Sequence, residues 1–318
     1  MPTRAPKPAS KRSKLKRPKL NILRAQNLEK IPWLVHGFST RTGGFSRAYG
    51  KGDLSLGFTK DDTRATVERN RVAFLSGLEA TSSRQNRNAP RWQLITLRQV
   101  HSDIIHHVDS RHIDSNQVAS DPDAPLTGDG LITATPGLLL GIQTADCLPI
   151  ILVDSKRRAV GVFHAGWRGT VKRIVEKGAG EMHHWFGTRP EDVKAAIGPG
   201  IGGCCYEVGE EVRTKFESQF SYAAKLFREV KDSDPVREKY PLLFLSARAP
   251  GHGELPPKIF LDLAEANRRQ LLSVGVSAKS IEASPMCTNC RTDLLFSYRA
   301  EKGKTGRMMA VAGIQPKS

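Results

Sequence analysis

The stretch LPIILVDSKRRAVGVF, residues 148–163, decides the fold class of this sequence. It holds two apolar runs, 148–153 and 159–163, on either side of the polar segment 154–158. Short continuous apolar runs are typical of strands that are buried on both faces, and a short polar connection between two of them predicts an antiparallel hairpin. We therefore expect a β-hairpin in the core, near the middle of the chain.

The flanking sequence predicts further strands and helices in irregular alternation. Strands are expected at 91–100 and 138–143, and helices at 63–75, 170–186, 208–220 and 262–274, with Gly275 ending the last helix. A hairpin in mid-chain does not fit a regular βαβ repeat. We therefore expect an α+β fold with mixed β-sheets in the core and helices packed outside.

The charge of the chain is concentrated at its beginning. The net charge is +17, and nine Lys and Arg residues lie within 1–24, where no acidic residue occurs. Prolines in this segment oppose a helix, so we expect residues 1–28 to be a disordered basic tail that binds nucleic acid at most weakly. Residues 29–318 are expected to form a single domain with a proline-rich surface insertion at 231–258.

Apolar runs and cysteine usage exclude two classes of protein. No apolar run approaches the roughly 20 residues of a membrane helix. Five cysteines are too few and too unevenly spaced for a disulfide scaffold, and no signal peptide follows Met1. We therefore expect a cytoplasmic protein that binds no membrane.

Three potential metal ligands lie at the ends of expected strands. Cys147 precedes the hairpin, His164 follows its second strand, and His101 follows the strand at 91–100. Strand pairing would bring Cys147 and His164 together. Two histidines and a cysteine with a fourth position free for water are a ligand set of catalytic zinc, and the metal would keep the thiol ionised. A buried cysteine that only fills space and surface histidines remain open as alternatives.

The same residues carry a resemblance to a known family. QVH at 99–101, TADC at 144–147 and HAGWRG at 164–169 resemble signature blocks of the YfiH/DUF152 family. Further similar blocks are HGFSTRTGG at 36–44, AIGPGIG at 196–202, CCYEV at 204–208, CTNC at 287–290 and FSYR at 296–299. The resemblance covers about residues 30–316 and implies the CNF1/YfiH-like cysteine hydrolase architecture. GDG at 128–130 stands where the family usually has Gly-Asp-Ala.

The resemblance also implies a function. The family was labelled multicopper polyphenol oxidase (laccase) and is described as zinc-dependent purine nucleoside phosphorylases. It implies Zn²⁺ on His101, Cys147 and His164, with copper the less favoured metal. The implied reaction is phosphorolysis of adenosine, inosine, guanosine or S-methyl-5'-thioadenosine to the base and ribose 1-phosphate. Adenosine deaminase activity is implied as a second reaction.

Basic residues in the similar blocks are candidates for binding phosphate, because a guanidinium group matches phosphate oxygens. Arg41 is the first choice and part of the expected catalytic group, since the glycines at 43–44 let backbone amides approach an anion. Arg168 and Arg299 are the other candidates. Asp146 is expected either to orient a ligand imidazole or to cap a turn.

Two other enzyme classes stay open at this point. Cys147 as nucleophile with His164 as base would make a hydrolase, and family relatives have been linked to peptidoglycan-precursor editing. A copper-dependent polyphenol oxidase ranks last, because multicopper chemistry needs more histidines than these blocks supply. A non-catalytic binder with a basic tail leaves the three ligand blocks unexplained.

Four further cysteines are interpreted as structural or incidental thiols. A single CxxC is a weak signal, and an adjacent cysteine pair is poorly placed to complete a four-cysteine zinc site. These residues are Cys204, Cys205, Cys287 and Cys290.

Overall fold

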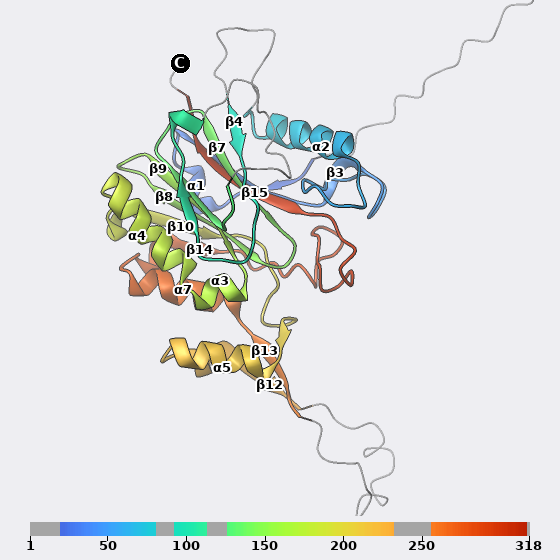
Figure 1. Cartoon of the computed structure of the whole chain (residues 1–318), viewed down its shortest axis with the longest axis vertical. Helices are drawn as coiled ribbons and strands as arrows, with labels where there is room; N and C mark the ends of the chain where they lie inside the picture. Colours follow the sequence, from blue (N-terminus) through green and yellow to red (C-terminus); the bar gives the residue numbers. More distant parts are fainter. Residues whose placement is uncertain (1–19, 81–91, 113–125, 232–255, 317–318) are drawn as a thin grey trace, which may run out of the picture.

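A computed structural model describes residues 20–80, 92–112, 126–231 and 256–316. Two large β-sheets lie in the middle of the molecule, between α2 on one side and α3, α4 and α7 on the other (Figure 1). The helices are α1 (Gln26–Glu29), α2 (Arg64–Gly77), α3 (Trp167–Val171), α4 (Ile174–Phe186), α5 (Glu210–Gln219) and α7 (Leu263–Ser273). The arrangement is the α+β class with mixed sheets that the sequence predicts.

The strands of the two large sheets come from all parts of the chain. The first sheet has the order β1-β2-β15-β7-β4, which are Ile22–Leu23, Leu34–Ser39, Met308–Ile314, Leu138–Thr144 and Gln93–Ile95. The second has the order β14-β10-β8-β9-β6-β5, which are Ile281–Ala283, Val193–Ile197, Leu148–Asp154, Ala159–Ala165, Gly130–Thr133 and Ile105–His107. The short strand β3 (Thr42–Ser46) lies against α2.

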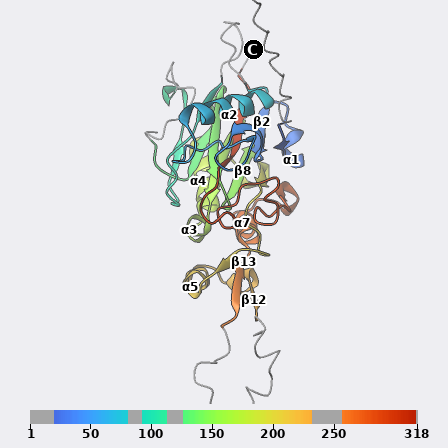
Figure 2. The ribbon, with the colours of Figure 1, turned by 90° about the vertical axis from the view of Figure 1, so that its right-hand side faces the viewer.

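A small third sheet extends the molecule. It has the order β11-β13-β12, with strands Glu207–Val208, Lys258–Leu261 and Phe227–Val230. Together with α5 it lies at the end of the molecule opposite α2, as two perpendicular views show (Figures 1 and 2). β12 and β13 pair antiparallel and flank the predicted insertion at 231–258, of which residues 232–255 lie outside the described part.

Alternation along β8 explains why its sequence is apolar from Leu148 to Val153. Ile150 and Leu152 belong to the core between the second sheet and the helices, whereas Ile151 and Val153 belong to the core between the two sheets. Both faces of the strand are therefore buried. Each such side chain contributes about 1.5–3 kcal/mol when it is removed from water. These two cores hold the second sheet in the centre of the fold.

The predicted hairpin is confirmed as β8 and β9. Their register places Pro149 opposite His164 and Leu148 opposite Ala165. The strand before the hairpin, β7, belongs to the first sheet. The chain therefore passes from one sheet to the other over residues 145–147, and this crossing carries the cysteine that the sequence singles out.

Side chains of the preceding residues cap the first turns of α2 and α7. Thr63 caps α2 by accepting from the N–H of Thr66, and Asp262 caps α7. Gly275, just after α7, has a φ of +94°, as expected of a residue that ends a helix. The helix predicted at 170–186 is wrong in its first part, because Arg173 has a φ of +64° and separates α3 from α4.

Two predicted boundaries are wrong. The domain begins before residue 29, since β1 pairs with β2 and Leu28 is fully buried between the two large sheets. Residues 1–19 of the predicted tail lie outside the described residues. The strand predicted at 91–100 is limited to β4, because beyond it the chain leaves β7 and Arg98 forms a bridge to Thr127.

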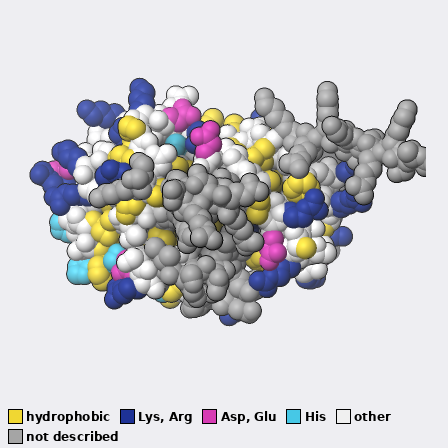
Figure 3. Space-filling view, turned by 90° about the horizontal axis from the view of Figure 1, so that it is seen from above, with side chains coloured by type: hydrophobic (Ala, Val, Ile, Leu, Met, Phe, Trp, Pro, Cys, Tyr) yellow, Lys and Arg dark blue, Asp and Glu magenta, His cyan; other side chains and the backbone are white. Residues whose placement is uncertain are grey.

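Basic side chains outnumber acidic ones on the face seen from above in Figure 3. On the face shown in Figure 3, Lys and Arg side chains are distributed along the outline and acidic side chains are sparse. In the described residues, no helix has the length and apolar composition that a membrane crossing requires.

The buried His36 of β2 predicts a loss of stability at acidic pH. Its Nε2 accepts a hydrogen bond from the N–H of Ala25, and burial lowers its pKa from 6.5 to about 4. Between these values the unfolded chain takes up a proton that the folded chain does not. The free energy of unfolding is therefore not reduced by His36 above pH 6.5, and it falls as the pH falls from 6.5 toward 4. The total loss is about 3 kcal/mol, at 1.36 kcal/mol per pKa unit.

Urea unfolding of the wild type and of His36→Gln, at about pH 7.5 and about pH 4.5, measures this loss. The variant should lose less stability between the two pH values. His184→Gln, which changes an exposed histidine of α4, should behave as the wild type. Equal losses in wild type and His36→Gln would contradict the assignment.

Candidate active site

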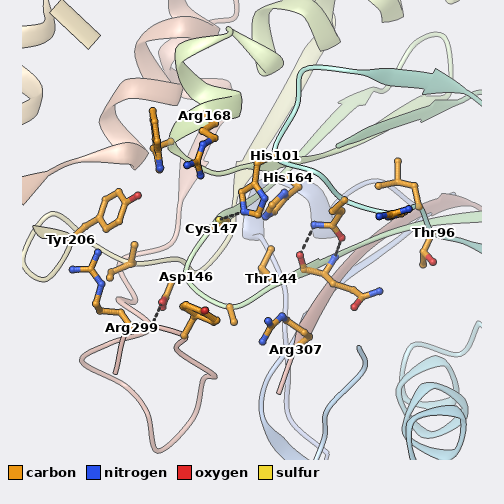
Figure 4. A pocket seen from close by; sticks show the side chains of 18 of the residues that line it. Thr96, His101, Thr144, Asp146, Cys147, His164, Arg168, Tyr206, Arg299 and Arg307 are labelled. Carbon is orange, nitrogen blue, oxygen red and sulfur yellow. Dashed lines mark hydrogen bonds between the residues drawn. The ribbon is translucent and has the colours of Figure 1, made fainter. Parts of the chain in front are cut away.

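Three side chains meet where the chain crosses between the two large sheets. One ligand atom each from His101, Cys147 and His164 lies within 4.8 Å of the other two. The Nε2 of His101 is 3.8 Å from the Sγ of Cys147, and the two imidazole rings are 4.9 Å apart (Figure 4). The structure thus brings together the three residues that the sequence singles out as metal ligands.

Backbone geometry makes this close approach possible. His101 lies in the loop after β4 and has a φ of +58°, a left-handed conformation that is uncommon for a residue with a side chain. Gly166, just after β9, leaves room for the other groups. A Cβ at this position would lie 2.9 Å from the Sγ of Cys147 and 3.1 Å from the Cδ2 of His101. Any larger residue here would push the site apart.

The buried carboxylate of Asp129 holds the backbone of the His101 loop. It accepts hydrogen bonds from the N–H groups of Val100, His101 and Ser102, at 3.2, 3.0 and 2.5 Å, and from the Ser102 hydroxyl at 2.7 Å. Three consecutive N–H groups that point at one carboxylate fix the loop. This explains how His101 keeps its unusual φ.

Asp129 also orients the second histidine. The Nδ1 of His164 donates to Asp129 Oδ1 at 2.7 Å. The remaining nitrogen, Nε2, is therefore left to face Cys147 or a metal. Burial raises the pKa of Asp129, but its hydrogen bonds with His164 and Ser102 outweigh burial and lower it to about 2. The carboxylate is thus ionised at any physiological pH.

Charge is shared between the thiol and the imidazole. Burial raises the pKa of Cys147, but the facing His164 and His101 lower it from 9.0 to about 6. Burial lowers the pKa of His164, but Cys147 and Asp129 raise it from 6.5 to about 9. Without a metal, the pair at neutral pH is a thiolate and an imidazolium.

The donor set fits a divalent transition metal. Bonds of about 2.0–2.1 Å to nitrogen and about 2.3 Å to sulfur place these atoms about 3.6 Å apart at a tetrahedral angle. The 3.8 Å between His101 Nε2 and Cys147 Sγ is close to that value. The orientation of His164 by a carboxylate is the arrangement usual for metal-bound histidines. His101, Cys147 and His164 would leave one position open.

The three side chains line a cavity of about 730 Å³. Its walls are basic, because four arginines line it and Asp146 is its single acidic residue. The arginines are Arg98, Arg168, Arg299 and Arg307, and the aromatic residues of the wall are Phe58, Trp167, Tyr206 and Tyr298. Figure 4 shows Arg168, Arg299 and Arg307 around the three central side chains. This lining favours an anionic ligand.

The arginines of the cavity differ in the polar contacts that their guanidinium groups already make. Arg299 donates to the carbonyl of Glu207, at 3.0 Å, and Arg307 donates to nearby backbone carbonyls. The guanidinium of Arg168 lies over the ring of Trp167, 4.5 Å from its centre. Among the described residues, Arg168 forms no ion pair with a carboxylate, so its charge is available in the cavity.

Two of the predicted site residues have other roles. Arg41 does not line the cavity; its guanidinium is held by Asp53 at 2.7 Å and Glu301 at 3.1 Å. A guanidinium that is already paired with two carboxylates is not a phosphate ligand. Asp146 does not orient an imidazole, since its carboxylate accepts from the Ser297 hydroxyl at 2.7 Å and the Arg299 N–H at 2.7 Å.

The other four cysteines are interpreted from the sequence as structural or incidental thiols. The expectation that they are poorly placed to form one group is wrong. Their sulfur atoms all lie within 4.8 Å of one another, although the two pairs are more than 80 positions apart. We call them the four-cysteine cluster, which consists of Cys204, Cys205, Cys287 and Cys290. An adjacent pair in a tight turn can present both sulfurs to the same point, which its spacing alone does not indicate.

The sequence profile of a protein family described as "Multi-copper polyphenol oxidoreductase laccase" matches residues 35–315. The chain belongs to this family. It is 35% identical to a purine nucleoside phosphorylase of Deinococcus radiodurans over 93% of this chain and 94% of the relative. It is also 35% identical to an adenosine deaminase, RL5, of an unknown prokaryotic organism, over 67% of this chain and 72% of the relative.

Solved structures of the family share the fold. Bacillus licheniformis YfiH is 30% identical with a TM-score of 0.72, over 89% of this chain and 93% of that chain. YlmD from Geobacillus stearothermophilus is 30% identical with a TM-score of 0.70, over 92% of this chain and 94% of that chain. The resemblance to the YfiH family that the sequence motifs indicate is thereby confirmed.

Sequence reasoning missed several residues of this family member's site. Asp129 was the most important, and its signal was the GDG block at 128–130, which resembles a family motif. Gln99 and Gln143 in the cavity wall were missed too. The side-chain amide of Gln99 donates to the carbonyl of Gln143 at 2.8 Å and accepts from its N–H at 2.7 Å. Tyr206 lies within the CCYEV block and also lines the cavity.

The lowered pKa of Cys147 predicts its reactivity in the metal-free protein. After removal of metal with a chelator, the rate of alkylation of Cys147 by iodoacetamide should rise with pH through about 6 rather than 9. Mass spectrometry of the Cys147 peptide measures this rate. In His164→Asn the imidazolium is lost, so the midpoint should move upward.

His184→Asn, which changes an exposed histidine outside the cavity, should leave the midpoint unchanged. A wild-type midpoint near pH 9 would show that the histidines do not ionise the thiol.

Proposed function

We propose that this chain is a zinc-dependent purine nucleoside phosphorylase. One observation carries the proposal: the group formed by His101, Cys147 and His164 opens into a cavity lined by four arginines. A metal site beside an anion site suits a reaction between a neutral nucleoside and phosphate. Two relatives that are similar to this chain over about nine-tenths of their length are named purine nucleoside phosphorylases, which supports the same activity.

The substrates we propose are adenosine, inosine, guanosine and S-methyl-5'-thioadenosine, together with inorganic phosphate. A cavity of about 730 Å³ is within the usual size of small-ligand sites and holds a nucleoside and a phosphate ion. Arg168 would bind phosphate oxygens through its planar guanidinium. The aromatic residues of the wall offer flat surfaces for a purine.

Phosphorolysis requires an anion close to a positive charge that develops on the ribose. Cleavage of a glycosidic bond passes through a state that resembles an oxocarbenium ion, and the departing base must receive a proton or a hydrogen bond. Zn²⁺ would supply Lewis-acid polarisation of a substrate atom at its open position. Arg168 and Arg299 would hold phosphate in the cavity.

Tyr206 is suited to donate a hydrogen bond in this site. Burial, with the nearby Cys147, raises the pKa of its phenol well above the ordinary value. The hydroxyl therefore keeps its proton at neutral pH. In Figure 4 it points toward the centre of the cavity, where a purine nitrogen or a sugar oxygen would accept from it.

Adenosine deamination is proposed as a second activity of the same site. The similarity to a relative named adenosine deaminase supports it. Both reactions place a purine nucleoside beside the same three ligands. In deamination water would attack C6 of the purine and ammonia would leave, whereas in phosphorolysis phosphate would attack the ribose C1′ and the base would leave.

One alternative is favoured by a specific observation. Cys147, His164 and Asp129 form a thiol, imidazole and carboxylate series, with the carboxylate 2.7 Å from Nδ1 of the histidine. This is the order of groups in a cysteine hydrolase. A hydrolase acting on peptidoglycan precursors is therefore the second candidate. A copper oxidase is disfavoured, because two histidines in the described metal group are too few for a multicopper cluster.

Metal dependence separates the two candidates. Liquid chromatography of adenosine incubated with and without phosphate should show adenine only when phosphate is present. A chelator should abolish this release and Zn²⁺ should restore it. His101→Ala should lose the metal held by this group, and with it the activity, because a cysteine and one histidine make a poor zinc site.

His106→Ala is the matched control, since His106 lies near in the sequence but contacts the carbonyl of Thr127 rather than the metal group. It should retain metal and activity. Activity that survives chelation and is lost on alkylation of Cys147 would favour the hydrolase.

The charge of Arg168 should determine the affinity for phosphate. Arg168→Ala removes one charge-assisted contact worth about 1.5–3 kcal/mol, so the KM for phosphate should rise about tenfold or more. Arg189→Ala, which changes an exposed arginine paired with Glu191, should leave the KM unchanged. An unchanged KM in Arg168→Ala would place the phosphate elsewhere in the cavity.

A further inference from the structure

The four-cysteine cluster lies beside the cavity and outside the proposed active site. The Sγ of Cys290 is 3.7 Å from that of Cys204 and 3.4 Å from that of Cys205. Cys287 completes the cluster, with all four sulfurs within 4.8 Å of one another. Two of the four cysteines are exposed and Cys287 is buried, so a metal could enter from the surface.

A tight turn presents the first pair of cysteines. The N–H groups of Cys205 and Tyr206 both donate to the carbonyl of Gly202 at 2.9 Å, which folds the backbone around this residue. Gly202 itself is close to the sulfurs. A Cβ there would lie 3.2 Å from the Sγ of Cys204 and 3.3 Å from the Cβ of Cys287. The turn therefore leaves the space between the pairs free.

A second turn presents the other pair and is bonded to the first segment. The N–H of Arg291 donates to the carbonyl of Cys287 at 3.0 Å, which curls the CxxC segment. Gly200 and Cys287 form a parallel bridge, and the N–H of Thr288 donates to the carbonyl of Gly200 at 3.0 Å. The backbone thus fixes the distance between the two pairs.

The observed sulfur–sulfur distances fit a tetrahedral metal site. Four Zn–S bonds of about 2.3 Å separate the sulfurs by about 3.8 Å, close to the 3.4 and 3.7 Å observed. The N–H of Gly202 points at the Sγ of Cys287, at 3.2 Å. Such a bond favours a thiolate, which is the form that binds a metal. A disulfide would join two of the sulfurs and leave two thiols unexplained.

We propose that the four-cysteine cluster is a second metal site, which binds Zn²⁺ through four thiolates and has a structural role. Four soft ligands leave no position open for substrate, which distinguishes this site from the one in the cavity. The assignment does not depend on the proposed function, because none of its ligands belongs to the active site.

The structural role follows from the position of the two cysteine-containing segments next to the wall of the cavity. The first segment continues to Tyr206 and the second to Arg299, and both residues line the cavity. Residues 284–307 contain no helix or strand between β14 and β15. The local core beneath them has only Leu295, Phe296 and Met308 as fully buried members. A metal that joins the two segments would hold this wall of the cavity, as zinc does in small domains with little core.

The stoichiometry of bound zinc tests the proposal. The full chain is loaded with Zn²⁺ in reducing buffer, freed of unbound metal and analysed by plasma mass spectrometry. The wild type should bind two zinc ions per chain, one for each of the two groups of ligands. Cys147→Ala should keep one ion, and the double variant C204S/C290S, which changes the two exposed cysteines of the cluster, should also keep one.

Cobalt substitution identifies which ion remains. Absorption from thiolate-to-cobalt charge transfer grows with the number of thiolates, so Cys147→Ala loaded with Co²⁺ should keep most of it. C204S/C290S should lose most of it. If the double variant does not fold, Zn²⁺ should still protect all four cluster thiols of Cys147→Ala from alkylation.

Three results would overturn the assignment. One is a Cys147→Ala protein that binds no zinc. Another is a set of cluster thiols that react at the same rate with and without Zn²⁺. The last is a disulfide between two of the four cysteines in the zinc-treated protein under mild reduction.

Discussion

The carboxylate of Asp129 accepts hydrogen bonds from three consecutive backbone N–H groups and from the Nδ1 of His164, and the geometry of the site depends on it. The backbone bonds keep His101 in a left-handed conformation that it would not adopt alone. The side-chain bond fixes which nitrogen of His164 is free. One buried charge therefore positions two of the three proposed metal ligands, and its burial is stabilised because every bond it accepts favours the ionised form.

The third ligand depends on how the two sheets are connected. β7 ends in the first sheet and β8 begins in the second, so only residues 145–147 span the gap. Asp146 has a φ of +91° in this crossing, and its carboxylate is bonded to Ser297 and Arg299. These bonds stabilise a strained backbone in a short connection. As a result, Cys147 faces His164 at the end of β9 and His101 in the loop after β4.

The sequence predicts those features of this arrangement that short stretches of residues determine. The hairpin follows from apolar runs, and the ligands follow from their places at strand ends and from the family motifs. Asp129 and Asp146 each stand in a short polar block, and nothing in their neighbourhood shows which of them bonds the imidazole. The sequence does not indicate that Arg41 is paired with Asp53 and Glu301, which are 12 and 260 positions away, because ion pairs of this kind leave no periodic pattern.

Asp146 connects the two cysteine-containing groups through both its side chain and its backbone carbonyl. Asp146 precedes Cys147, and its carboxylate accepts a hydrogen bond at 2.6 Å from the hydroxyl of Thr288, which follows Cys287. The carbonyl of Asp146 accepts from the N–H of Ile201, in the segment that leads to the other cysteine pair. Movement of either cluster segment would therefore act on the backbone that presents Cys147. Because the crossing is only three residues long, these bonds make the position of Cys147 depend on the two segments that carry the four-cysteine cluster.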